Sequence, residues 1–121
     1  MKKLSGLFLI FVFTIFSFSV VAQDVSTNLK EKFKVYGNCG MCKSKIEKAA
    51  NSVEGVKSAK WNVETKKIIV KFDSSKTTNE AIKKAIAKVG YDTEEFRAKD
   101  ETYNALHSCC KYDRPAVKKN K

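Results

Sequence analysis

Residues 33–42 read FKVYGNCGMC and lead from a strand pattern through a short loop into a helix pattern. Phe33 and Val35 alternate with polar neighbours, which is typical of a half-buried strand. The loop contains two glycines and two cysteines, so the backbone can turn tightly where the cysteines come together. From Cys42 onward, apolar residues recur at helical spacing, which predicts an amphipathic helix. Its predicted apolar face comprises Cys42, Ile46, Ala49, Ala50 and Val53.

Two alternating runs beyond this helix predict a β-hairpin. Gly55 interrupts the helix pattern, and residues 59–63 then alternate apolar and polar side chains. Residues 68–72 show a similar alternation after the short polar turn Glu64-Thr65-Lys66. Such runs separated by a few polar residues are typical of paired strands. We therefore expect them to form the second and third strands.

A second helix is predicted after the hairpin. Residues 77–80, TTNE, are a candidate capping box, in which a hydroxyl and a carboxylate satisfy each other's free amides. Gly90 is a typical helix stop. The predicted inner face of this helix comprises Ile82, Ala85, Ile86 and Val89.

These patterns together define a fold class. Residues 91–98 predict a fourth strand, although their pattern is less regular because the apolar residues do not all fall on one face of a strand. The element order over residues 31–98 is then β-α-β-β-α-β. That order predicts an α+β, ferredoxin-like domain with two helices on one face of a four-stranded antiparallel sheet.

The first 22 residues have the features of a secretory signal peptide. Lys2 and Lys3 precede an apolar run, and small residues lead to a cleavage site expected after Ala22. The alternative is an uncleaved N-terminal membrane anchor, since the apolar run approaches the ~20 residues that span a bilayer. We expect an exported, periplasmic protein whose mature form does not span the membrane. Residues 23–30 are polar and are interpreted as a linker.

The chain is basic, with a formal charge of +11 that falls to +9 when Lys2 and Lys3 are removed. A basic surface can serve nucleic acid, an anionic membrane or an acidic protein partner, or it can simply be solvated. Export argues against nucleic acid as a partner. Trp61 and Phe72 also occupy core-like positions, whereas RNA-recognition domains expose aromatic residues on their middle strands.

Four cysteines occur as two pairs, Cys39 with Cys42 and Cys109 with Cys110. An even cysteine count in an exported protein favours disulfides. Small disulfide-stabilised domains spread their cysteines along the chain, whereas these cluster at two points. Ordinary disulfides therefore remain an alternative, and a thiol site is the preferred interpretation.

The spacing of the first pair suits a soft metal ion. Thiolates select Cu(I), Hg(II), Cd(II), Zn(II) or an iron–sulfur unit over hard ions. Cys42 is expected in the first helical turn, where the helix dipole and the nearby Lys43 favour a thiolate. Structural zinc and iron–sulfur clusters require about four ligands. A loop that supplies two thiolates favours Cu(I) first, with Hg(II), Zn(II) or Cd(II) as alternatives.

Residues 31–98 resemble the heavy-metal-associated domain of copper chaperones, metal-transport ATPases and periplasmic mercury-binding proteins. The resemblance rests on four motifs: the Cys39–Cys42 loop, VEGV at 53–56, the hairpin at 63–73 and AKVGY at 87–91. It implies a ferredoxin-like fold and metal binding at Cys39 and Cys42. It also implies transfer to a metal-transporting membrane protein or another metal-accepting protein.

The site departs from the family pattern in one respect. The family loop commonly reads Gly-Met-Thr before its first cysteine, where this chain has Tyr36-Gly37-Asn38. Met41 does not replace that methionine; it is either a thioether neighbour of the metal or a packing residue. Tyr91 is expected either to shield the site or to be an ordinary strand residue.

The C-terminal tail, residues 99–121, contains further soft ligands. A short helical turn is expected around residues 103–106, and the lysine-rich end, residues 118–121, is expected to be disordered. Cys109, Cys110 and His107 either join the metal site, which makes mercury or zinc binding plausible, or form a second thiol site or a disulfide. Adjacent residues in an extended chain point in opposite directions, so both cysteines reaching one ion is unfavourable.

The main rival function is an exported thiol–disulfide oxidoreductase that uses the same Cys-x-x-Cys loop. A disulfide between Cys39 and Cys42 is chemically feasible. Thioredoxin-like enzymes, however, require a different strand order and a proline facing the cysteines, and residues 31–98 contain no proline. We therefore expect a metal carrier or scavenger and no enzyme.

Overall fold

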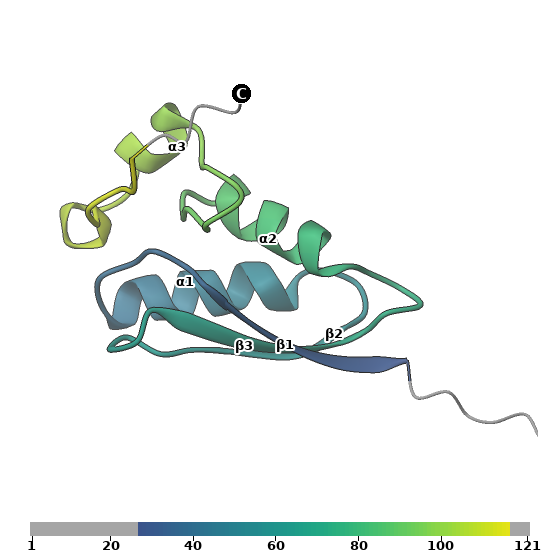
Figure 1. Cartoon of the computed structure of the whole chain (residues 1–121). Coiled ribbons are helices and arrows are strands. Elements are labelled where there is room, and N and C mark those ends of the chain that lie inside the picture. Colours follow the sequence, from purple (N-terminus) through teal and green to yellow (C-terminus); the bar gives the residue numbers. More distant parts are fainter. Residues whose placement is uncertain (1–26, 117–121) are drawn as a thin grey trace, which may run out of the picture.

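A computed structural model describes residues 27–116 of the chain (Figure 1). The predicted signal peptide, the first part of the predicted linker and the lysine-rich end at residues 118–121 lie outside the described residues. The described elements, in chain order, are β1 (Asn28–Lys34), α1 (Gly40–Asn51), β2 (Val56–Trp61), β3 (Lys67–Asp73), α2 (Asn79–Lys88), α3 (Asp100–Asn104) and the 3₁₀ helix η1 (Ser108–Cys110).

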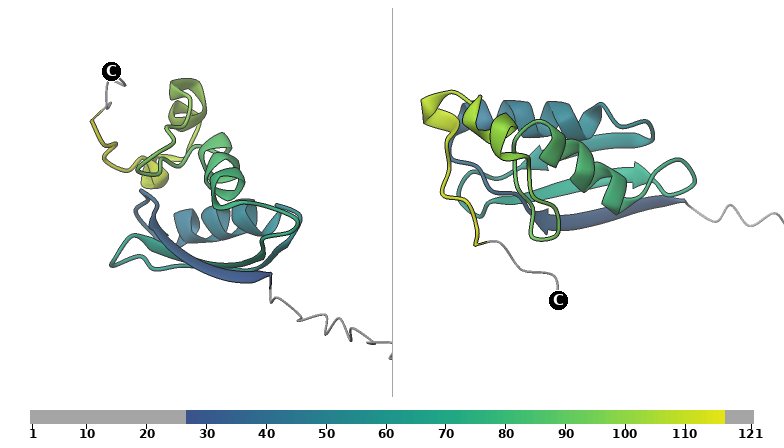
Figure 2. Two further views of the ribbon diagram at one scale, coloured as in Figure 1. Left: turned by 45° about the vertical axis from the view of Figure 1, so that its right-hand side comes forward. Right: turned by 90° about the horizontal axis from the view of Figure 1, so that it is seen from above.

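The strands form an antiparallel sheet in the order β1-β3-β2, with β3 in the centre. The alternation predicted for the third strand is confirmed, because Ile68, Val70 and Phe72 are buried while their neighbours are exposed or half-buried. Helices α1 and α2 lie side by side over one face of this sheet (Figure 2). The prediction of an α+β fold with two helices on one face of an antiparallel sheet is therefore confirmed.

The prediction of a fourth strand is wrong for the described chain. Residues 91–98 contribute to the sheet only a bridge between Val35 and Thr93. The segment instead pairs with itself, because the Thr93 amide donates to the Phe96 carbonyl (2.8 Å) and the Phe96 amide donates to Thr93 Oγ1 (3.0 Å). These local hydrogen bonds occupy the groups that a strand would offer to β1.

Several element ends also differ from the predictions, among them those of β2, which spans Val56–Trp61 and not 59–63. Strand β1 begins at Asn28, inside the predicted linker, because Asn28–Lys30 pair with Lys71–Asp73 of β3 through main-chain hydrogen bonds that do not require apolar side chains. Helix α2 has the predicted hydroxyl cap, with Thr78 Oγ1 accepting from the Ala81 amide (3.1 Å). The reciprocal carboxylate is not part of it, since Glu80 forms an ion pair with Lys84.

The hydrophobic core lies between the sheet and the helices and extends into the tail. Trp61, Ile68 and Ile86 are buried at its centre. Leu106, Cys110 and Tyr112 belong to the same buried cluster, so the tail packs onto the domain and is not a separate segment. Among residues 27–116, no helix combines the length and apolar character needed to cross a membrane.

Candidate metal centre

The β1–α1 loop places two thiols at the start of a helix. Cys39 is the N-cap residue of α1, with extended backbone, and its carbonyl accepts from the Lys43 amide (3.0 Å). Cys42 follows in the first turn and is fully buried, whereas Cys39 is half-buried. The predicted position of Cys42 is confirmed.

The loop lies directly on the core, which limits the side chains it can carry. A Cβ atom at Gly37 would lie 3.1 Å from both Ile46 Cδ1 and the Trp61 ring. Contacts this short are tighter than ordinary packing, so glycine allows the loop to approach the core here. The Trp61 ring is held in turn by a hydrogen bond from its Nε1 to the Val35 carbonyl (3.0 Å).

The tail brings a third sulfur to this pair. The Sγ atoms of Cys39, Cys42 and Cys110 all lie within 4.8 Å of one another, and Cys110 is fully buried. We call these three thiols the cysteine cluster. The tail backbone closes over it, because Cys39 Sγ lies 3.7 Å from the Cys109 carbonyl oxygen and Cys42 Sγ lies 4.0 Å from that of Cys110.

The other predicted tail ligands lie outside the cluster. Cys109 is exposed, and its Sγ lies 3.7 Å from Met41 Sδ and 3.9 Å from Cys110 Sγ. His107 is exposed and caps η1 through its backbone, accepting from the Cys110 amide (2.8 Å). The 3₁₀ turn thus directs Cys110 inward while Cys109 remains at the surface beside the exposed Met41.

Tyr91 lies beneath the cluster. Its side chain is fully buried, and its hydroxyl has no hydrogen-bond partner among the described residues. Burial, followed by the neighbouring thiols of Cys110 and Cys42, raises the pKa of Tyr91 far above its usual range. Gly90 directs the chain toward this position with φ of +109°, a region that favours glycine.

The two family cysteines differ in their protonation. Amide hydrogen bonds, first from Cys42 and then from Met41, lower the pKa of the Cys39 thiol. Burial raises the pKa of the Cys42 thiol. Cys39 is therefore the more readily ionised sulfur of the metal-free protein.

Lys43 contacts groups other than the sulfurs. Its ammonium group forms an ion pair with Glu47, which follows it by one helical turn, and donates to the Trp61 carbonyl (3.0 Å). Glu47 also accepts from the Trp61 amide (2.9 Å). Lys43 thus links α1 to β2, and the helix-end amides provide the described stabilisation of Cys39.

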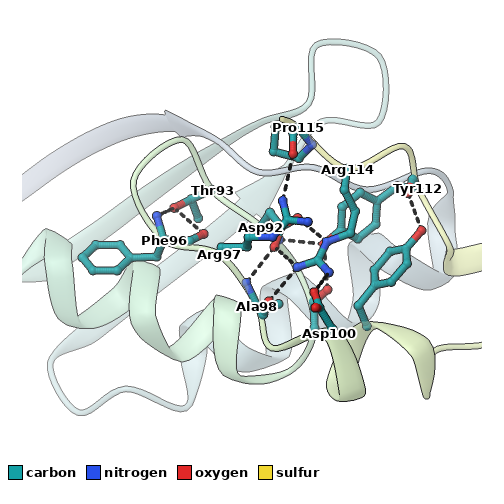
Figure 3. Close-up of polar contacts among 11 residues, drawn as sticks. Asp92, Thr93, Phe96, Arg97, Ala98, Asp100, Tyr112, Arg114 and Pro115 are labelled. Atoms are coloured by element: carbon teal, nitrogen blue, oxygen red, sulfur yellow. Dashed lines mark hydrogen bonds and ion pairs between the residues drawn. The ribbon is translucent and has the colours of Figure 1, made fainter. Parts of the chain in front are cut away.

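A network of polar contacts fixes the tail against the domain (Figure 3). Arg114 forms two contacts with the fully buried Asp92, Nε–Oδ2 at 2.8 Å and Nη2–Oδ1 at 3.0 Å. It also donates to Asp100 Oδ1 (2.7 Å) and to the Ala98 carbonyl (2.6 Å). We call Arg114 and these three partners the tail clamp.

Tyr112 adds a second attachment. Its hydroxyl donates to the Gly90 carbonyl (2.8 Å) and accepts from the Asp92 amide (2.8 Å), and its ring stacks on Tyr91 with centroids 5.8 Å apart. The sequence analysis missed Asp92, Tyr112 and Arg114, because the contacts that join them span 20 to 22 residues. The aromatic residues Tyr103 and Tyr112 were a sign in the sequence that the tail packs against the domain.

The fold and the cysteine cluster define a class, a small α+β metal-binding domain with thiols at a helix N-terminus. Residues 33–92 match the family described as heavy-metal-associated domain. The chain belongs to this family. The match ends at residue 92, so Cys110 and the rest of the tail lie beyond it.

Several similar proteins have names of copper proteins. The copper chaperone CopZ of Staphylococcus aureus (strain MRSA252) is 44% identical over 55 residues, which are 46% of this chain and 81% of that protein. A solved structure named CopZ metallochaperone is 41% identical with a TM-score of 0.52, covering 54% of this chain and 98% of the other. The Cu(I)-loaded N-terminal domain of a potential copper-translocating P-type ATPase from Bacillus subtilis is 30% identical, also with a TM-score of 0.52, covering 55% of this chain and 84% of that domain.

Proposed function

We propose that this protein binds Cu(I) through the thiolates of Cys39 and Cys42 and carries it to another metal-binding protein, without catalytic turnover. The observation that carries the proposal is the pair of thiols at the N-terminus of α1, in a domain whose relatives are named copper chaperones. Thiolates are soft ligands that bind Cu(I) in preference to hard ions, and two thiolates are fewer than the four ligands of structural zinc.

The unequal burial of the two cysteines suits capture and transfer. Cys39 is half-buried, so an incoming thiol can approach an ion bound there, and its lowered pKa favours the thiolate that the ion requires. Cys42 is fully buried and holds the ion from the protein side. Metal binding displaces the proton of each thiol, so the ion compensates for the raised pKa of Cys42.

The proposal also covers the acceptor protein and the compartment, each supported by its own observation. The similarity to the N-terminal domain of a copper-translocating ATPase supports a metal-transporting membrane protein as the acceptor. The features of residues 1–22 support export, with the carrier acting outside the cytoplasm as residues 23–121. The basic composition supports docking to an acidic surface of the acceptor.

Anaerobic competition titration with a chromogenic Cu(I) chelator tests the metal site. Residues 23–121 are expected to bind Cu(I) stoichiometrically, and Cys39→Ser and Cys42→Ser are each expected to weaken that binding strongly. Cys109→Ser is the matched control, since it removes a thiol outside the cysteine cluster. Circular dichroism verifies that each variant is folded. Undiminished affinity in either Cys39→Ser or Cys42→Ser would reject the site.

A further inference from the structure

We propose that Cys110 is a third metal ligand, so that the tail completes a three-thiolate site for Cu(I) and retains the ion until an acceptor displaces one sulfur. This inference rests on the proposed function, because it adds a ligand to the same site. It concerns a residue that lies beyond the family match, which ends at residue 92.

The spacing of the cysteine cluster suits one shared ion. Three thiolates around an ion at about 2.3 Å, the usual zinc–thiolate distance, are separated from one another by about 4 Å. The Sγ atoms of Cys39, Cys42 and Cys110 lie within 4.8 Å of one another. Small side-chain rotations therefore suffice to bring all three into contact with one ion.

The Tyr91 hydroxyl is an independent observation that points to charged sulfur at this position. It is fully buried beside the thiols of Cys42 and Cys110 and forms no hydrogen bond of ordinary geometry with any described residue. A buried donor without an acceptor is unfavourable, and buried hydroxyls are normally paired. Metal-bound thiolates are stronger acceptors than thiols, so loading the site with metal gives this hydroxyl a stronger acceptor than the neighbouring thiols provide.

The third thiol is held in position by contacts remote from the metal. The tail clamp joins Arg114 to Asp92, and the Tyr112 hydroxyl donates to the Gly90 carbonyl. Tyr112 follows Cys110 by two residues, so both contacts hold the tail close to this thiol. Cys110 is consequently positioned before any ion arrives, and preorganised ligands lose less entropy on binding. Cys109, one residue before Cys110, lies at the surface with its sulfur beside that of Met41. Its substitution is the control for substitution of Cys110.

A double variant makes the sulfur count unambiguous. After removal of residues 1–22, the sulfur atoms are those of the four cysteines and Met41. Cys109→Ser combined with Met41→Leu leaves the cysteine cluster as the entire sulfur content. X-ray absorption of the Cu(I)-loaded, monomeric double variant should show three sulfur neighbours, as in the unmodified protein, and sedimentation verifies that no second copy contributes.

Removal of Cys110 supplies the affinity measurement. Cys110→Ser should show two sulfur neighbours and bind Cu(I) at least 10- to 100-fold more weakly, about the loss seen when groups that merely orient ligands are removed. Cys109→Ser should retain the original affinity. If Cys110→Ser does not fold, the sulfur count of the double variant decides by itself.

The outcomes separate this inference from the proposed function. Two sulfur neighbours in the double variant, or unchanged affinity in Cys110→Ser, would overturn the third ligand and leave Cys39 and Cys42 as the site. Absence of Cu(I) binding by the unmodified protein would overturn the proposed function itself.

Discussion

Cys39 and Cys42 lie three residues apart, yet their surroundings give them different reactivity. Cys39 caps α1 and is half-buried, whereas Cys42 lies in the first turn of the helix and is fully buried. Amide hydrogen bonds lower the pKa of Cys39, and burial raises the pKa of Cys42. Amide hydrogen bonds at one thiol and burial of the other therefore shift the two pKa values in opposite directions.

This difference predicts the order of alkylation in the reduced, metal-free protein. The thiolate is the reacting form, so Cys39 should react with iodoacetamide at a lower pH than Cys42. A pH series analysed by tandem mass spectrometry, which resolves the two residues within one peptide, measures both rates. Cys39→Ser provides the control for the intrinsic rate of Cys42. Earlier modification of Cys42 would contradict the assignment.

At the scale of the elements, α1 and β3 matched their sequence patterns, β2 began and ended earlier than predicted, and residues 91–98 did not form the predicted strand. Apolar periodicity predicts elements that bury one face, as β3 does with Ile68, Val70 and Phe72. Residues 91–98 are instead organised by polar side chains. Asp92 accepts from the Ala98 amide (2.7 Å), and Thr93 bonds with Phe96. Periodicity contains no information about such contacts.

The tail clamp should contribute strongly to stability. Arg114→Ala leaves the buried carboxylate of Asp92 without its cationic partner, which costs about 3–5 kcal/mol for a buried ion pair. Urea unfolding measures the change in the free energy of unfolding. Arg97→Ala is the matched control, because Arg97 is exposed and donates to the Pro115 carbonyl (2.8 Å), and a surface change of this kind costs at most about 0.5 kcal/mol. Equal stability of the two variants would show that the clamp is energetically unimportant.

At the scale of the whole molecule, the described chain is one packed unit that includes its tail. The tail crosses the N-terminal end of α1, where η1 lies close to the cysteine loop (Figure 2). Leu106, Cys110 and Tyr112 extend the core of the domain. The cysteine cluster is thus assembled from two segments about 70 residues apart, the β1–α1 loop and η1.

The predicted export concerns the whole chain, since it depends on cleavage of residues 1–22. Expressed with its own N-terminus in a bacterium, the chain should be recovered outside the cytoplasm with the intact mass of residues 23–121. Ala22→Arg places a large charged residue at the predicted cleavage site and should yield the uncleaved mass. Full-length protein in the cytoplasmic fraction would contradict export, and full-length protein in the membrane would favour the anchor.

The sequence alone was sufficient for the α+β class, for α1 with its cysteine loop and for the family, because local periodicity and a short motif encode them. The sequence did not show which tail residue lies beside Cys39 and Cys42, because His107, Cys109 and Cys110 all carry soft ligand atoms. Tertiary structure distinguished them: the 3₁₀ turn directs Cys110 inward, and Arg114 and Tyr112 attach the tail to residues some 20 positions away. Contacts between residues so distant in sequence depend on the packed fold, and no local pattern contains them.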